Sequence, residues 1–139
     1  MASDNPAGYS GTPLAKKLGI KAACRLYLVN APAGYLALLA PLPAGVQVME
    51  RANGGVDVAQ IFVTERTELN RQLTQLRKTL RADAALWISW PKKSARVAST
   101  VTEDTIRELA LPMGFVDIKV CAVDAVWSGL KLVVRKELR

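Results

Sequence analysis

Residues 56–91 read VDVAQIFVTERTELNRQLTQLRKTLRADAALWISWP, and this stretch decides the fold. Its two ends, 56–63 and 84–90, are largely apolar runs without strict alternation, which is typical of strands buried on both faces of a parallel sheet. Between them, leucines recur at steps of four, three and four residues, which places them on one side of a helix: Leu69, Leu73, Leu76 and Leu80. The stretch therefore predicts a strand, a helix that packs on the sheet, and a second parallel strand.

The helix between these strands has charges that suit its dipole. Thr64 precedes it and is expected to cap its first amides. Glu65 and Glu68 lie in its first turn, and basic residues lie in its last turns: Arg77, Lys78 and Arg81. Pro91 should end the strand that follows, because proline cannot donate a backbone hydrogen bond.

Further elements are predicted on either side of this unit. Toward the N-terminus we expect a helical turn with Thr12 as its N-cap, a strand, a short helix and a second strand, at residues 14–18, 25–30, 35–40 and 46–50. Toward the C-terminus we expect a helix opened by Thr102 and two strands, at residues 115–123 and 130–134. The connection between these last strands is short, so they should pair as an antiparallel hairpin. The whole pattern predicts a three-layer, Rossmann-like α/β fold with a mostly parallel sheet.

The composition is that of one ordinary globular domain. The chain has 139 residues, of which 50 % are hydrophobic and 22 % are charged. We expect residues 14–139 to form a single domain, and the small, polar residues 1–13 to form a flexible arm. No secretory leader is recognisable, which favours a cytoplasmic location.

The stretch from Leu26 to Met49 carries no charge and is long enough to resemble a membrane span. A spanning helix is nevertheless disfavoured there, because Pro32, Pro41 and Pro43 would each remove a helical hydrogen bond. We therefore expect no membrane segment.

The chain contains no histidine and two cysteines. The absence of histidine excludes imidazole bases, Ser-His-Asp triads and His-ligated metals. Cys24 and Cys121 are predicted to lie on strands roughly 19 Å apart, so we expect free thiols and no metal site. No pair of aspartates is expected to converge, and no serine has a neighbouring base. The residues thus give no catalytic group, and the chain is read as more suited to binding than to catalysis.

Three segments resemble class I S-adenosylmethionine-dependent methyltransferases: Asp57 at the entry of a buried strand, residues 80–90 (LRADAALWISW), and the closing hairpin. The resemblance covers residues 24–136 and implies the strand order 2-1-4-5-7-6 in that family's labels. The family's third strand and the helix that accompanies it are missing between Glu50 and Val56. The resemblance therefore implies a shortened methyltransferase-like fold.

The cofactor turn departs from that family's pattern, which has an acidic residue and a glycine-rich turn after the first strand. Leu28 stands at the acidic position, Asn30 and Pro32 replace the first two glycines, and Gly34 alone remains. Glu50 matches the carboxylate that holds the ribose hydroxyls in the family. On this basis no cofactor is expected, with S-adenosylmethionine in an atypical site as the alternative.

A second resemblance runs nearly the whole chain. Residues 8–21 (GYSGTPLAKKLGIK), 90–93 (WPKK) and 127–130 (WSGL) resemble a family of small, largely actinobacterial proteins of unknown function. This resemblance implies a cytoplasmic bacterial protein and brings no activity with it.

A ligand site is predicted where the parallel strands end, because open α/β sheets bind ligands beyond those carboxyl ends. The expected lining residues are Asn30, Gly34, Glu50, Thr64, Trp90, Lys92 and Lys93. The two lysines and a stacking indole favour an anionic or nucleotide-like ligand, and Tyr9, Ser10 and Gly11 are a candidate lid. In the alternative interpretation, Trp90 packs under the N-terminal arm and the lysines are merely solvated.

The net charge of +7 permits an anionic partner, and the basic residues fall into four groups: Lys16, Lys17 and Lys21; Arg77, Lys78 and Arg81; Lys92, Lys93 and Arg96; and Lys131, Arg135, Lys136 and Arg139. No recognised nucleic-acid motif accompanies them, so the expectation is weak, salt-sensitive association.

Three functions follow from the sequence, in order of preference. The first is a non-catalytic, methyltransferase-like binding or regulatory module. The second is a methyltransferase or other nucleotide-ligand enzyme with an atypical site, and the third is a basic accessory protein for nucleic acid. The sheet edges are compatible with a monomer or a homodimer.

Overall fold

A computed structural model describes residues 12–139, and its strands form a single six-stranded sheet in the order β2-β1-β3-β4-β6-β5. Four strands are parallel: β1 (Arg25–Val29), β2 (Gln47–Met49), β3 (Val58–Phe62) and β4 (Ala85–Pro91). The last two, β5 (Phe115–Ala122) and β6 (Trp127–Val134), form the predicted antiparallel hairpin, and β6 pairs with β4. When β3 to β6 are given the methyltransferase labels 4 to 7, this order is the predicted 2-1-4-5-7-6.

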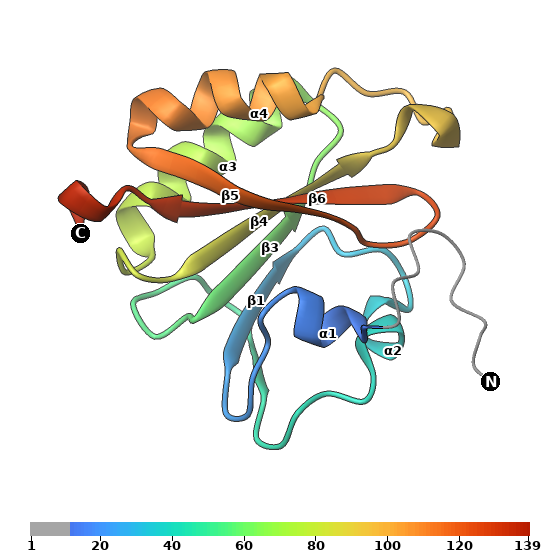
Figure 1. The fold of residues 1–139 in the computed structure, drawn as a ribbon, viewed down its shortest axis with the longest axis vertical. Coiled ribbons are helices and arrows are strands. Elements are labelled where there is room, and N and C mark those ends of the chain that lie inside the picture. The colour runs from blue at the N-terminus through green and yellow to red at the C-terminus, as the bar shows by residue number, and fades with distance from the viewer. Residues whose placement is uncertain (1–11) are drawn as a thin grey trace.

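Helices cover both faces of the sheet and complete the three predicted layers (Figure 1). One face carries α3 (Arg66–Thr79) and α4 (Glu103–Ala110), and the other carries α1 (Leu14–Lys17) and α2 (Tyr35–Leu39). Single 3-10 turns follow at η1 (Lys93–Ala95), η2 (Leu111–Met113) and η3 (Lys136–Leu138). No helix or strand lies between β2 and β3, which is where the sequence predicts a missing strand and helix.

Each face of the sheet has its own apolar core. The larger core, under α3 and α4, contains three of the four predicted leucines of α3 as fully buried side chains, and Leu80 packs at its border. The smaller core lies under α1 and α2 and is centred on Trp87, whose indole N–H donates to the Leu18 carbonyl oxygen at 2.9 Å. All five residues of β3 are buried, because this strand lies between both cores.

The start of α3 differs from the prediction. The helix begins at Arg66, and the side chain of Thr64 does not cap it. Instead, the hydroxyl of Thr100 accepts a hydrogen bond from the Arg66 amide at 2.7 Å, and the Thr100 amide donates to the Thr64 carbonyl oxygen. The loop after β4 therefore caps α3, which removes the need for a local cap.

The hairpin turn is also shorter than predicted, because β6 begins at Trp127 and not at residue 130. The carboxylate of Asp124 accepts hydrogen bonds from the amides of Val126 and Trp127, both at 2.8 Å, and the Val123 amide donates to the Trp127 carbonyl oxygen at 2.9 Å. Gly129 is a residue of β6.

Pro91 ends β4 as predicted, as the last residue of the strand, and it pairs with Trp127 of β6. One smaller boundary differs. α1 begins at Leu14 after Pro13, so Thr12 is not its cap. The helix opened by Thr102 is as predicted, with a capping box to Thr105.

Gly129 is required by packing against Trp87. A Cβ atom at position 129 would lie 3.2 Å from Cε3 of Trp87 and 3.3 Å from Cγ2 of Val123. Trp87 is fully buried and fixed by its bond to Leu18, so it has little freedom to move away.

Gly129→Ala should therefore destabilise the fold by about 1–3 kcal/mol, the usual cost of overpacking a tight core. Urea unfolding followed by circular dichroism measures this free energy. Gly54→Ala is the matched control, because a Cβ atom there meets nothing within 4 Å. Equal stabilities of the two variants would show that the Trp87 contact does not require glycine.

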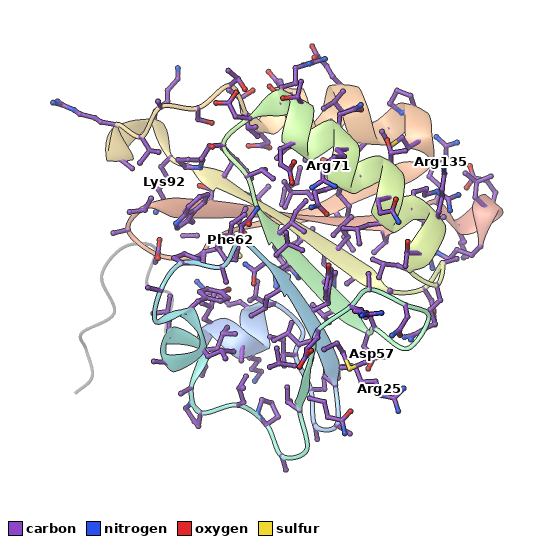
Figure 2. The ribbon with its side chains drawn as sticks, turned by 180° about the vertical axis from the view of Figure 1, so that it is seen from behind. Arg25, Asp57, Phe62, Arg71, Lys92 and Arg135 are labelled. Carbon is purple, nitrogen blue, oxygen red and sulfur yellow. The ribbon has the colours of Figure 1, made fainter. Side chains whose placement is uncertain are left out.

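Asp57 joins β1, β3 and the end of α3 at the amino ends of the strands (Figure 2). Its carboxylate accepts the Arg25 amide at 2.8 Å and one guanidinium N–H of Arg81 at 2.7 Å. The hydrogen bond from the Arg25 amide, followed by that from Arg81, holds the pKa of Asp57 below its ordinary value.

Because this pKa is lowered on folding, the ionised carboxylate stabilises the fold above the unfolded pKa of about 3.9, and the contribution is lost as the pH falls through the folded pKa. Asp57→Asn should thus reduce the free energy of unfolding at pH 7, and the difference from the parent chain should shrink below about pH 4. Urea unfolding across pH 2–7 measures it. Asp83→Asn is the control, since Asp83 shares Arg81 but is far more exposed; a larger loss there would contradict the assignment.

Candidate functional site

A cavity of about 300 Å³ opens at the carboxyl ends of β1 and β3. These neighbouring strands form the topological switch point of the sheet, because the chain adds β2 on one side of β1 and β3 on the other. The cavity's lining comes from the ends of both strands, the start of α3 and the start of β6: Asn30, Phe62, Val63, Thr64, Glu65, Glu68 and Trp127. We call it the strand-end cavity. Figure 2 shows Phe62 at this end of the sheet and Asp57 at the other.

The floor of the strand-end cavity is a row of aromatic rings. Phe62 packs edge to face against Tyr35 and Trp127, with ring centroids 4.9 Å and 5.1 Å apart. The Tyr35 hydroxyl donates to Oε1 of Gln60 at 2.6 Å, and Nε2 of Gln60 donates to Oγ of Ser89 at 3.0 Å. Burial raises the pKa of Tyr35, so this phenol stays neutral. Tyr35, Gln60 and Ser89 do not line the cavity, but their hydrogen bonds hold the ring against which Phe62 packs.

The charges that line the strand-end cavity are acidic. Glu68 is held by Arg71 at 2.7 Å and by Gln72 at 3.1 Å, and the hydrogen bond from Arg71 lowers its pKa. Glu65 is exposed at the N-cap position of α3, and no ion pair within residues 12–139 includes it. The cavity therefore offers one available carboxylate and no lysine.

The turn after β1 has two residues in the left-handed backbone region, although it keeps only one glycine. Asn30 has a φ of 58°, in the left-handed region that asparagine tolerates better than most residues, and Gly34 has a φ of 79°. Pro32 has no amide hydrogen, and its carbonyl oxygen accepts the Tyr35 amide at 3.1 Å.

These features do not fit S-adenosylmethionine in the mode of the methyltransferases that the sequence resembles. At the acidic position the chain has Leu28, which packs against the smaller core. The turn lacks one amide donor because of Pro32, and the helix that follows has five residues. The methionine part of that cofactor would lack the carboxylate, and one amide of the turn, on which it depends in those methyltransferases.

Of the predicted site residues, the structure brings Asn30 and Thr64 together in the strand-end cavity. Gly34 and Glu50 lie elsewhere on the same edge of the sheet. Gly34 is the N-cap of α2, and open space lies beside it, since a Cβ atom there meets nothing within 4 Å. Glu50 follows β2 and is exposed.

Trp90, Lys92 and Lys93 do not line the strand-end cavity. Trp90 is 8 % exposed and packs in the larger core, on the face of α3 and α4, so its ring offers no open stacking surface. The Lys92 amide donates to the Val126 carbonyl oxygen at 2.7 Å, which ties the loop after β4 to the hairpin turn. Lys93 is exposed on η1. The candidate lid, Tyr9 to Gly11, lies outside the described residues.

The predicted set of site residues omits five residues that line this cavity: Phe62, Val63, Glu65, Glu68 and Trp127. In the sequence, Phe62 and Val63 belong to an apolar run, and Glu65 and Glu68 suit the helix dipole. Val63 and Glu65 flank Thr64, so the end of a buried strand is the signal that points to them. Nothing in the sequence indicates that Trp127 reaches β3.

The two cysteines, the acidic residues and the helices within residues 12–139 bear on thiol chemistry, metal binding and membrane insertion. Cys24 and Cys121 are free, and burial raises the pKa of both thiols, which makes them poor nucleophiles. No described group of three or more Cys, Asp or Glu residues is arranged to hold a metal ion. None of the described helices combines the length and apolar character that a membrane crossing requires.

Comparison with known proteins agrees with the topology. No protein-family model and no curated protein matches the chain. Among solved structures, it is similar to an S-adenosylmethionine-dependent methyltransferase from Aquifex aeolicus, with 16 % identity over 88 % of both chains and a TM-score of 0.63. The fold is methyltransferase-like.

Two further structures show the same likeness. A candidate type 11 methyltransferase from Sulfolobus solfataricus has 11 % identity over 88 % of this chain and 90 % of its own, with a TM-score of 0.61. Fibrillarin from Aeropyrum pernix, solved with natively bound S-adenosylmethionine, has 13 % identity over 86 % of this chain and 73 % of its own, with a TM-score of 0.56. At such identities the likeness concerns the fold alone.

Proposed function

We propose that this chain is a methyltransferase-like binding module that takes a small ligand in the strand-end cavity and does not bind S-adenosylmethionine in the usual mode. The observation that carries the proposal is the contrast between two neighbouring features. The turn after β1 has Pro32, which donates no amide hydrogen, and Leu28 in place of an acidic residue, whereas a cavity of about 300 Å³ opens where β1 and β3 end.

The cavity's lining indicates the chemistry of the ligand. The half-buried Trp127 supplies apolar ring surface, with the buried ring of Phe62 packed against it, and Asn30 and Thr64 supply hydrogen bonds at the rim. Glu65 adds a carboxylate, which favours a positive or hydrogen-bond-donating group and disfavours phosphate. A ligand with one planar ring system and a neutral or cationic polar end fits these groups, and its size is that of a nucleoside. The anionic ligand expected from Lys92 and Lys93 would have to bind outside this cavity.

A nucleoside should therefore bind more tightly without a phosphate than with one. Adenosine and 5′-amino-5′-deoxyadenosine should shift the amide signals of Asn30, Thr64 and Glu65 and the indole signal of Trp127 in protein NMR titrations. Adenosine monophosphate should bind more weakly, because its phosphate approaches the carboxylate of Glu65. Asn30→Gly keeps the positive φ, removes one hydrogen-bonding side chain and should weaken adenosine binding about 2- to 10-fold.

The substitution Glu65→Gln removes the negative charge and keeps the size of the side chain. This variant should reduce the affinity of the amino analogue more than that of adenosine. Glu137→Gln is the control, because this glutamate is 72 % exposed near the C-terminus and does not line the cavity. If millimolar nucleosides leave the cavity signals unchanged, or if the phosphate form binds best there, the proposal fails.

The second candidate is a methyltransferase with an atypical cofactor site, and one observation favours it. Glu50 is exposed directly after β2, and β2 pairs in parallel with β1, so its carboxylate stands at the edge where the resembled family holds the ribose.

Thermal unfolding with S-adenosylmethionine and S-adenosylhomocysteine distinguishes the two candidates. The binding-module proposal predicts no stabilisation that depends on Glu50. The enzyme candidate instead predicts about 2.7 kcal/mol of stabilisation at 100 times the dissociation constant, and its loss in Glu50→Gln. Glu108→Gln serves as the control, since Glu108 is 62 % exposed and pairs only with Arg66 among the described residues.

A further inference from the structure

Five lysines that are separated in the sequence come together on the side of the sheet that α1 covers. Lys16 and Lys17 belong to α1, Lys21 lies in the loop that follows, and Lys119 and Lys131 lie on β5 and β6. We call these residues the lysine cluster. In the sequence, Lys16, Lys17 and Lys21 form one basic group and Lys131 belongs to another, whereas Lys119 belongs to none of the four groups.

Hydrogen bonds and strand register establish that the lysine cluster is continuous. Lys119 and Lys131 are direct cross-strand partners, so their side chains share one face. Nζ of Lys119 donates to the Lys17 carbonyl oxygen at 3.2 Å, and Nζ of Lys17 donates to the Ala122 carbonyl oxygen at 3.3 Å. Nζ of Lys131 lies 3.9 Å from the position that a Cβ atom would take at Gly19, between α1 and Lys21.

Four of the five lysines have no ion-pair partner among the described residues. Lys16, Lys21, Lys119 and Lys131 take part in none of the ion pairs within residues 12–139, all of which use arginine. Like charges directly opposite one another on neighbouring strands are destabilising. Burial, and then the charges of Lys119 and Lys21, lower the pKa of Lys131. A bound polyanion would relieve this repulsion.

Two open hollows adjoin the lysine cluster. One, of about 490 Å³, is lined by Lys16, Lys17 and Lys119 together with Thr12 and the end of β5, and none of its described lining residues is acidic. The other, of about 410 Å³, has Lys21 and Lys131 on one side. Its two described carboxylates, Asp57 and Asp83, both already pair with Arg81. Among residues 12–139, no aromatic residue lines either hollow.

We propose that the lysine cluster binds the phosphodiester backbone of a nucleic acid without reading its bases. The amines are spread over four segments and two hollows, which suits a row of phosphates better than one compact anion. Lysine supplies point charges without the planar fork that selects a single phosphate. The described lining contains no aromatic ring for base stacking or for anchoring at a membrane interface, so the lysines are the groups that it offers to a ligand. The strand-end cavity contributes none of these residues, so this inference stands apart from the function proposed for that cavity.

Fluorescence anisotropy with a labelled mixed-sequence DNA duplex of about 20 base pairs tests the proposal, in a titration from about 50 to 200 mM salt. If three to five lysines contact phosphates, log K should fall with log salt with a slope of about −3 to −4.5. Lys119→Gln/Lys131→Gln should make this slope less negative by about 2, because two phosphate contacts are lost. Lys119→Gln alone, at an exposed position, should change it by about 1 and keeps the test valid if the double variant unfolds.

Lys78→Gln/Lys136→Gln is the matched control. It removes the same charge from two exposed lysines outside the cluster, one on α3 and one on η3, and should change the slope by less than about 0.5. An equal effect of both double variants would show that net charge alone drives binding and would overturn the proposal. The proposal is also overturned if the duplex does not bind at about 50 mM salt, or if micromolar pyrophosphate displaces the duplex. A third contrary result would be that the lysine substitutions weaken binding to vesicles of anionic lipid but leave binding to the duplex unchanged.

Discussion

Strand β3 is buried along its whole length, and much of the remaining structure serves to cover it. Val58 to Phe62 lie between the two apolar cores, so one face needs α3 and α4 and the other needs α1 and α2. The strand also carries a fully buried amide, Gln60, which would be costly without hydrogen-bond partners. Tyr35 from α2 and Ser89 from β4 supply them. This requirement ties the short helix after β1 to the centre of the sheet, and it fixes the aromatic floor on which the strand-end cavity rests.

The order of elements could be predicted because it depends on local patterns. The apolar runs, the leucine spacing of α3 and the proline and glycine breaks each act over a few residues. Even the absent third strand could be inferred, since too few residues separate Glu50 from Val56 to hold one. The structure agrees with each of these expectations in the strand order and in the two helical layers.

The details that failed depend on contacts distant in sequence. The hydroxyl of Thr100 caps α3 from the far side of β4, and no pattern near Thr64 could show this. Trp90 lies at the end of an apolar run in which neighbouring side chains point to opposite faces, so the sequence does not say which face it joins. The same limit applied to Trp127, which lines the strand-end cavity only because β6 pairs antiparallel with β4 and brings it beside Phe62. Both the cap and the cavity are products of the sheet's assembly.

The distribution of charge follows a division of labour between arginine and lysine. Arginine forks bind carboxylates where the layers meet, as Arg81 does with Asp57 and Asp83, and Arg107 does with Asp117. Most lysines remain outside these pairs, and the cross-strand pair of Lys119 and Lys131 is placed where repulsion reduces stability. Every ion pair between described residues uses an arginine, whereas Lys16, Lys21, Lys119 and Lys131 are unpaired there and two of them face each other across β5 and β6. On the two proposals made above, the acidic strand-end cavity and the lysine cluster would select ligands of opposite charge.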